Sequence, residues 1–532
     1  MATTVVVSQG SRTATAQGHR QRPDWLFAGA LVTVLTLFAF AVHGYHPYAE
    51  DGGLYIAGIK RILDPGMYPH RSEFVLEHLR FSLFAPIVAV LVRGSRLSLE
   101  TVLMFLQFAC FWVTLFAGWM LAARCYSRRE MRVGAVALLA VWMTLPVAGT
   151  SLMLMDPYVT ARSISTPCAL LALTGVLSFL LPKDSTPGAR RRGLALCGVS
   201  LMLAALVHPL MASYALAGVL AIGAALPSRR KTRALAFIGL CLTGLGTAMA
   251  VQSLALPENL AYLNVAMTRR YWFLSEWHWY EWIGIAAPLM ILGWIATTRR
   301  DENNEARLVL ARMAVVTGVI ATIVAVLFAR VQMATHLVAR LQPLRVFQLV
   351  YVVMILAVGA ELANRVLQRR AVRWVVVFGM LATVMVLVER QTFPASAHIE
   401  LPSELQWSAP NNAWVQAFLW IRQNTPKDAL MALDADYITK PGEDAQSFRA
   451  IAERSALPDY SKDGGEASIT PELTSAWVEG QVAQSGLSDA TDARRIAALK
   501  PLGVGWVVLE RNAATAFVCD YANEAVKVCR LP

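Results

Sequence analysis

Long apolar runs recur along most of the chain and are separated by short polar segments. Each run is long enough, or nearly so, to cross the roughly 30 Å hydrocarbon layer of a membrane. The runs lie at residues 25–42, 99–123, 131–149, 164–181, 194–209, 211–227, 234–254, 279–298, 311–330, 344–363 and 373–389. The pattern predicts a mainly α-helical, polytopic transmembrane bundle of about 11 spans.

Basic residues between these runs predict the orientation of the bundle. Every second loop carries four Lys or Arg residues, and the short loops between them carry far fewer. The basic loops are 124–132, 183–192, 229–233, 299–312 and 365–373. Cytoplasmic loops are enriched in Lys and Arg, so we expect these loops and the N-terminus to be cytoplasmic.

One apolar segment, residues 74–92, does not fit this alternation as a span. It is interrupted by Glu77, His78, Arg80 and Pro86. A crossing here would invert every later loop against the positive-inside pattern. We therefore expect an amphipathic helix that lies on the outer membrane surface.

The two ends of the chain differ from the apolar part. Residues 1–24 are polar and predict a disordered cytoplasmic tail. Residues 25–390 then form the transmembrane domain, whose first outer loop is 44–98. The stretch 39–41 resembles a signal-peptidase site, but the preceding run is long for a signal core and favours an uncleaved first span.

Residues 391–532 are expected to fold as an extracytoplasmic α/β domain. Helical spacing occurs in 413–423, 471–484 and 490–499, strand-like runs lie at 429–433 and 504–510, and 516–530 has the pattern of a hairpin. This region contains 12 Lys and Arg against 18 Asp and Glu, a net charge of −6, whereas the rest of the chain has a net charge of +18. This difference in net charge indicates that the two parts of the chain face different compartments.

The composition agrees with a multi-pass protein of the cell (inner) membrane. Of the 532 residues, 56% are hydrophobic and only 16% are charged, which is too apolar for an ordinary soluble domain. The basic residues mostly separate apolar runs instead of alternating with polar and aromatic residues on a soluble surface. Binding to nucleic acid is therefore not expected.

Five of the seven cysteines lie in or beside apolar runs, where we expect small packing residues. Cys519 and Cys529 lie on the two arms of the expected hairpin. We predict a disulfide between them, which an oxidising compartment permits, and a pair of buried free thiols is the alternative. No cysteine spacing typical of a metal site occurs.

The first outer loop carries an acidic pair, Glu50-Asp51, followed by two glycines and Tyr55. The pair supplies a general base or orients an acceptor hydroxyl, or it forms an exposed turn at a helix end. Asp156 and Arg162 in the second outer loop are further site candidates, although a pairing between the two at the end of a span is the simpler expectation.

Four outer arginines are candidates for binding a lipid phosphate, because the guanidinium fork matches phosphate oxygens. They are Arg269, Arg270, Arg340 and Arg345. Contact with lipid headgroups is the alternative, and we expect one or two of the four to bind substrate. His208, before a proline, is a weaker candidate and more typical of a core histidine.

The layout resembles the GT-C-type integral membrane glycosyltransferases, and also bacterial membrane proteins of similar layout without an established activity. The resemblance depends on Glu50-Asp51 in YAEDGGLY, on the amphipathic stretch after it and on AWVQAFLWIRQNTPKDAL. It implies transfer of a sugar from a polyprenyl-phosphate carrier to an acceptor at the outer face, with a lipid-linked sugar donor and membrane lipids as partners.

In this interpretation Asp51, with Glu50 as second choice, lies near the acceptor hydroxyl, and arginines stabilise the departing phosphate. A divalent metal is compatible with the carboxylates, but no spacing requires one. Two other classes stay open. One is a transporter of lipid or polysaccharide, and the other is a non-catalytic membrane protein whose outer domain binds a partner.

Overall fold

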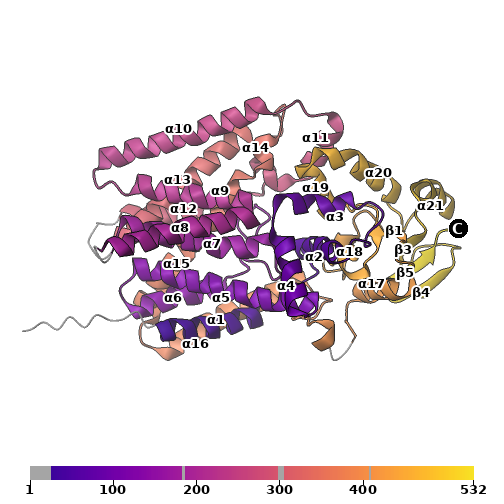
Figure 1. Ribbon diagram of the computed structural model, residues 1–532, viewed down its shortest axis with the longest axis horizontal. Helices are drawn as coiled ribbons and strands as arrows, with labels where there is room; N and C mark the ends of the chain where they lie inside the picture. The colour runs from indigo at the N-terminus through magenta and orange to yellow at the C-terminus, as the bar shows by residue number, and fades with distance from the viewer. Residues whose placement is uncertain (1–24, 183–185, 298–304, 406–408) are drawn as a thin grey trace, which may run out of the picture.

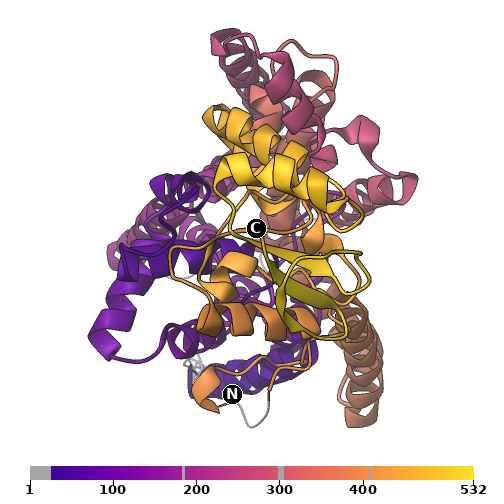
Figure 2. The ribbon, with the colours of Figure 1, turned by 90° about the vertical axis from the view of Figure 1, so that its right-hand side faces the viewer.

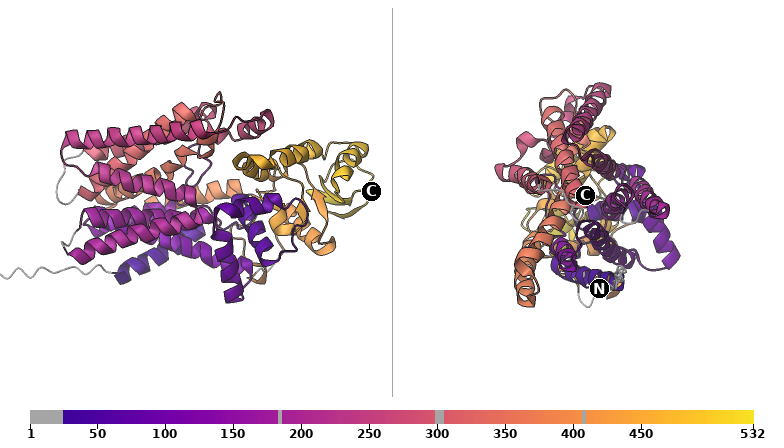
Figure 3. Two further views of the ribbon diagram at one scale, coloured as in Figure 1. Left: turned by 45° about the horizontal axis from the view of Figure 1, so that its top comes forward. Right: turned by 90° about the vertical axis from the view of Figure 1, so that its left-hand side faces the viewer.

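The protein consists of a bundle of long helices with a smaller domain at one end. The computed structural model describes residues 25–182, 186–297, 305–405 and 409–532. The expected cytoplasmic tail, residues 1–24, lies outside the described residues. The start of α1 and the C-terminal domain lie at opposite ends of the bundle (Figures 1 and 3).

The membrane part is almost entirely helical, and every one of the predicted apolar runs contains a helix. Its helices are α1 (Trp25–His43), α2 (Glu50–Leu63), α3 (Glu73–Leu76), η1 (Glu77–Phe81), α4 (Phe84–Ser95), α5 (Leu99–Cys125), α6 (Arg129–Val141), α7 (Ala161–Leu180), α8 (Pro187–Val207), α9 (Pro209–Ala225), α10 (Arg230–Leu254), α11 (Leu260–Met267), η2 (Arg270–Trp272), η3 (Leu274–Glu276), α12 (Trp279–Thr297), α13 (Glu305–Phe328), α14 (Leu337–Arg340), η4 (Pro343–Val346), α15 (Phe347–Leu362), η5 (Ala363–Leu367) and α16 (Ala371–Thr392).

Within the described residues, eight helical segments are long and apolar enough to cross a membrane, or nine if one bent pair counts as a span. The predicted count of about 11 spans is therefore not confirmed. Helices α6 and α9 have only 13 and 17 residues. Helix α8 has a cluster of arginines, residues 190–192, near its start.

Two of the predicted runs are interrupted by turns. Helix α6 ends at Val141, well before the predicted limit of residue 149, and the chain then folds back so that Pro146 lies opposite Met153. In that loop the amide of Met155 donates to the carbonyl oxygen of Met143 at 2.8 Å. Helices α8 and α9 are separated at His208, where Pro209 occupies the first turn of α9, a position that needs no amide hydrogen.

The segment predicted to lie on the outer surface is a bent helix. Helix α3 with η1 meets α4 at an angle of 98°. Phe81, Leu83, Val90 and Leu91 expose apolar side chains along it. In Figure 1, α4 runs across the direction of the long helices, next to the C-terminal domain. This geometry suits a helix at a membrane surface, and its position in the bilayer stays a prediction.

The C-terminal domain is a small α/β unit. Its elements are η6 (Ser403–Leu405), α17 (Ala413–Asn424), β1 (Leu430–Ala432), η7 (Tyr437–Thr439), α18 (Phe448–Ala452), β2 (Ser455–Ala456), α19 (Lys462–Ile469), η8 (Pro471–Leu473), α20 (Thr474–Gln484), α21 (Asp492–Leu499), η9 (Lys500–Leu502), β3 (Trp506–Glu510), β4 (Cys519–Ala522) and β5 (Val526–Arg530). Figure 2 shows this domain from the front.

One sheet organises the domain, with strand order β2-β1-β3-β5-β4. Strand β1 is parallel to β2 and β3, and β3, β5 and β4 are antiparallel. Helix α17 packs Phe418 and Ile421 into a core with Met431 and Val528. The hairpin of β4 and β5 brings Cys519 opposite Cys529, and a disulfide joins them, the pairing that the sequence analysis favoured.

A cluster of buried side chains connects α1, α16 and the linker, residues 393–412, that leads from α16 to the C-terminal domain. His46, which follows α1, lies 2.9 Å from Glu389 of α16 and 2.9 Å from Glu400 of the linker. His398 contacts the other oxygen of Glu389 at 2.6 Å. The carbonyl of Tyr45 accepts a hydrogen bond from the Glu400 amide. The linker is thereby fixed against the first outer loop.

Candidate functional site

The acidic pair of the first outer loop opens helix α2. Glu50 and Asp51 occupy its first turn, where the partial positive charge of a helix N-terminus favours carboxylates. Glu50 has a φ of 52°, a left-handed conformation that costs energy in a residue with a Cβ. Its amide donates to the Ala445 carbonyl of the C-terminal domain at 2.8 Å, which helps to hold that conformation.

Both carboxylates meet a cation from the C-terminal domain. The Nζ of Lys462, at the start of α19, lies 3.2 Å from Asp51 Oδ1 and also contacts Glu50. On the other side, Arg162 donates to Asp51 Oδ2 at 3.0 Å and to Asp156 Oδ2 at 2.9 Å. Three acids and two cations therefore form one continuous network at the junction of the two parts.

This network keeps Asp51 ionised. Burial by itself raises the pKa of Asp51, but the charges of Lys462 and Arg162 outweigh it and hold the pKa well below its usual range. The pKa of Lys462 is correspondingly raised: burial opposes its charge, and Glu50 and Asp51 more than compensate. Burial leaves the pKa of Asp156 raised despite Arg162. A carboxylate held this way is a weak base, and it suits orienting a hydroxyl better than removing its proton.

The two glycines after the acids permit the close approach of other segments. A Cβ on Gly52 would lie 2.5 Å from the Pro47 carbonyl oxygen and 3.0 Å from the Tyr158 ring. A Cβ on Gly53 would lie 2.1 Å from the Cβ of Ser447 in the C-terminal domain. Gly52 and Gly53 thus allow α2 to pack closely against the C-terminal domain. This packing helps to bring Lys462 to Glu50 and Asp51.

Arg345 is the candidate phosphate-binding arginine that belongs to this site. It lies in η4, and its charge interacts with those of Arg162 and Asp51. Its guanidinium faces the Tyr271 ring at 5.9 Å from the centroid. Within the described residues, the buried Nε of Arg345 and Oε1 of Gln342 have no hydrogen-bond partner. The backbone of Gln342 adopts a left-handed conformation, with φ of 49°.

The other three arginines have different surroundings. Arg269 donates to the Ser461 carbonyl at 2.7 Å and so fastens the segment between α11 and η2 to the start of α19. Arg270 is exposed. Arg340 lies 3.7 Å from Glu258 and over the ring of Tyr262. Arg269 and Arg340 therefore have structural contacts of their own.

His208 and Tyr55 lie at the edges of the network. The Nδ1 of His208 accepts a hydrogen bond from the Met211 amide and caps α9, and the charges of Arg162 and Arg345 act on its ring. The Tyr55 ring meets the ring of His78 edge-on, with centroids 5.3 Å apart.

No local pattern in the sequence predicted three residues of this junction, which are Lys462, Glu466 and His78. The stretch that forms α19 contains Gly464 and Gly465 and has no helical spacing of apolar residues. The available signal was a lysine beside acids in a domain of net negative charge. His78 was noted only because it interrupts an apolar segment.

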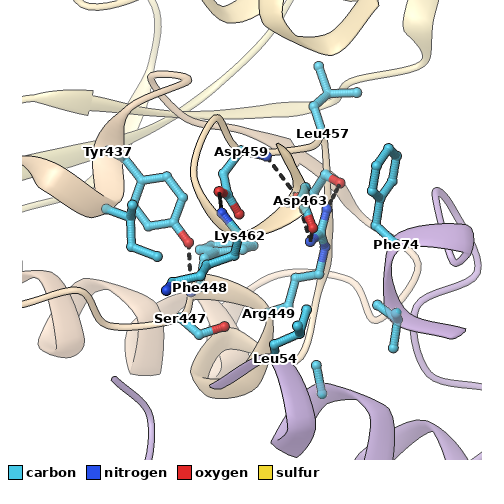
Figure 4. Close-up of a pocket in the computed structure, with 14 residues that line it drawn as sticks. Leu54, Phe74, Tyr437, Ser447, Phe448, Arg449, Leu457, Asp459, Lys462 and Asp463 are labelled. Atoms are coloured by element: carbon cyan, nitrogen blue, oxygen red, sulfur yellow. Dashed lines mark hydrogen bonds and ion pairs between the residues drawn. The ribbon is translucent and has the colours of Figure 1, made fainter. Parts of the chain in front are cut away.

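The junction is closed in this structure. A cavity of about 20 Å³ lies beside Lys462, between α2–α3 and the C-terminal domain, which is room for about one water molecule. Figure 4 shows the ion pair of Arg449 and Asp463 between Lys462 and Phe74, with Leu54 below it. A cavity of this size is too small for a ligand larger than a few atoms.

No metal-binding group emerges from this arrangement. Among the residues that the structure describes, no three His, Cys, Asp or Glu side chains converge to hold a metal ion. The Asp51 oxygens face Lys462 and Arg162 instead.

Comparisons with known proteins add little to this geometry. No protein-family model matches the chain, and no curated protein does. Among solved structures, the chain is similar to the apo crystal structure of an oligosaccharyltransferase from Archaeoglobus fulgidus, with a TM-score of 0.46 and 11% sequence identity. The match covers 92% of this chain and 70% of that chain. A similarity this weak assigns neither a family nor an activity.

Proposed function

We propose that this protein is a membrane glycosyltransferase of the GT-C type, which moves a sugar from a polyprenyl-phosphate carrier to an acceptor at the outer face of the membrane. The observation that carries the proposal is the Asp51 carboxylate held between Arg162 and Lys462 at the junction of the helical bundle and the C-terminal domain. Arg345 lies near enough for its charge to act on both Asp51 and Arg162.

Glycosyl transfer needs these two kinds of group close together. The acceptor oxygen forms a bond to the anomeric carbon, while the bond from that carbon to the phosphate oxygen breaks. The departing phosphate takes the electron pair, a nearby cation stabilises its charge, and the proton of the acceptor hydroxyl passes to a base of the site. Arg345, with an unpaired Nε in the described structure, is the proposed phosphate ligand.

Asp51 orients the acceptor in this proposal. Its carboxylate stays ionised and accepts a hydrogen bond from the acceptor hydroxyl, which holds the nucleophile in line with the anomeric carbon. Lys462 contacts both Glu50 and Asp51, so the charge of Glu50 changes the net charge around Asp51. No step is assigned to a metal, since no ligand set converges here in the described residues.

The location agrees with a substrate carried in the bilayer. Lipid-linked donors present their phosphate at the membrane boundary, and Asp51 follows the end of α1 at His43 by only a short loop. Domain organisation, with residues 391–532 outside the cytoplasm, is part of the proposal. The inner membrane location and the lipid-linked donor belong to it as well.

One test uses the purified protein in vesicles with farnesyl-phosphate donors that carry radiolabelled glucose, mannose or galactose. Membrane lipid extract supplies acceptors, and label leaving the donor is followed. We expect transfer from at least one donor, with a loss of about 100-fold or more in Arg345→Met. Arg330→Met changes an exposed arginine just after α13 that is not a site candidate, so it is the matched control and should leave transfer unchanged.

The closed junction favours a non-catalytic protein with a partner-binding outer domain as the second candidate. The cavity of about 20 Å³ beside Lys462 does not hold a sugar. If no donor in the panel loses its sugar and the junction stays closed in their presence, the glycosyltransferase proposal fails for these donors and the partner-binding function is favoured.

A further inference from the structure

Two helix faces oppose each other at the junction. Lys462 and Glu466 are four residues apart on α19, so their side chains share one face, and Asp51 and Tyr55 have the same spacing on α2. The contact between Lys462 and Asp51, at 3.2 Å, fixes the first pair of positions. Glu466 lies close enough for its charge to act on both Asp51 and Tyr55.

Glu466 is a buried acid to which the network gives no counter-charge. Its relative exposure is 7%. Among the described residues, its carboxyl forms neither a hydrogen bond nor an ion pair, although Lys462 lies one turn away on the same helix. Burying a carboxyl without partners is costly, which indicates a function other than packing.

His78 of η1 packs edge-on against Tyr55, on whose hydroxyl the charge of Glu466 acts, and the charge of Asp51 acts on the His78 ring. Both of its ring nitrogens are buried and have no partner in the described part of the chain, and the residue is 9% exposed. Gly58 on α2 makes room for it, since a Cβ there would lie 3.0 Å from His78 Nε2. The ring therefore has one donor and one acceptor available for a ligand.

We propose that Glu466 and His78 bind the hydroxyl group of the acceptor, and that Glu466, not Asp51, takes its proton. This inference rests on the proposed function. As the acceptor oxygen bonds to the anomeric carbon, its proton passes to a Glu466 oxygen, and the carrier phosphate leaves with the electrons of the broken bond. Asp51 then holds the nucleophile, and Glu466 is a catalytic residue supplied by the C-terminal domain.

The charges around Glu466 support this division of tasks. Burial, followed by the negative charges of Asp463, Asp51 and Glu77, raises the pKa of Glu466 to about 8. A base with a pKa near the working pH is better suited to proton transfer than one that is always ionised. The charges that act on Glu466 are those of Asp51 on α2, Glu77 on η1 and Asp463 on α19, and Glu466 in turn acts on Tyr55. Lys462 lies one turn away on α19, and His78 follows Glu77 on η1. Arg269 approaches α19 near Gly464 and Gly465.

The experiment compares Glu466→Gln with the wild type in the vesicle transfer assay, from about pH 5 to 9. Glutamine keeps the shape and the neutral charge of a protonated Glu466, so the variant should fold. Glu472→Gln, an exposed glutamate three residues beyond α19, is the matched control. Asp51→Asn is measured alongside as a separate test of the site.

We expect the wild-type rate to rise with pH as Glu466 loses its proton, and the control to follow it. Glu466→Gln should lose about 100-fold or more and show no such rise. Glu466→Asp should restore part of the rate, with a shifted pH profile. Suppose that transfer requires Asp51 but that Glu466→Gln keeps the wild-type rate and pH profile. That result contradicts this inference and leaves the proposed function intact. A wild-type protein that transfers no sugar overturns both this inference and the proposed function.

Discussion

Lys462 Nζ lies 3.2 Å from Asp51 Oδ1, and this contact joins residues that are 411 positions apart in the chain. The lysine begins α19 of the C-terminal domain, and the aspartate opens α2 of the membrane part. The C-terminal domain is therefore an integral part of the candidate site. Without it, Asp51 would keep only Arg162, and Glu50 would lose its cation.

Replacing Lys462 by Met should weaken both transfer and docking of the domain. The acids are partly exposed, so we expect a loss of about 1–2 kcal/mol in stability and at least a tenfold loss of transfer. A double-mutant cycle of Lys462→Met with Asp51→Asn, followed by thermal unfolding, should give a coupling energy of about 0.5–3 kcal/mol. Lys427→Met, an exposed lysine of the same domain, is the control. Strict additivity would show that the ion pair contributes nothing.

The raised pKa of Glu466 predicts how stability depends on pH. Below an unfolded-state pKa of about 4.5, both states hold the proton. Between that value and about 8, the unfolded state loses its proton while the folded state keeps it, so Glu466 lowers stability as pH rises. The loss is about 1.4 kcal/mol per pH unit at most. Thermal midpoints of the wild type should fall below those of Glu466→Gln between about pH 5 and 8. Parallel curves would refute the raised pKa.

Gly53 should not tolerate a side chain. A Cβ there would overlap the Cβ of Ser447, so Gly53→Ala should force α2 and the C-terminal domain apart and cost about 1–3 kcal/mol. The control is Gly94→Ala, where a Cβ meets nothing within 4 Å. Thermal stability of the purified variants measures the difference. Ser447→Gly added to Gly53→Ala should recover part of the loss, and equal stability of both alanine variants would disprove the contact.

The orientation of the protein is a further prediction. The alternation of basic loops places the C-terminal domain outside the cytoplasm. A reporter enzyme that is active only outside the cytoplasm, fused after Pro532, should therefore be active, and one that requires the cytoplasm should be silent. The opposite pattern would show that the positive-inside assignment of the loops is wrong.

Local sequence signals predicted much of the fold. The apolar runs located the helices of the bundle, and the helical spacing of 413–423 located α17, whose first amides donate hydrogen bonds to the side chain of Asn412. The pattern of 516–530 predicted the hairpin that pairs Cys519 with Cys529. Each of these features depends on residues close together in the chain, which is why periodicity and turn chemistry were sufficient.

The remaining features depend on contacts between distant segments. Helix α19 contains two adjacent glycines, which disfavour a helix, yet Gly464 packs closely against Arg269 and Trp477, and a Cβ there would lie 3.1 Å from an atom of each. Helix α6 ends early because its chain folds back in a buried loop. Lys462, Glu466 and Arg269 acquire their roles from this packing, and no local pattern distinguishes them from other polar residues.

The most direct test of the central claim is the rate of sugar transfer by Asp51→Asn. Asparagine removes the charge and keeps the shape, and Arg162 and Lys462 retain Asp156 and Glu50 as partners, so the variant should remain folded. We predict that transfer from the farnesyl-phosphate donors falls by about 100-fold or more, whereas Glu50→Gln loses less. Wild-type transfer by folded Asp51→Asn would contradict a reaction centre at Asp51.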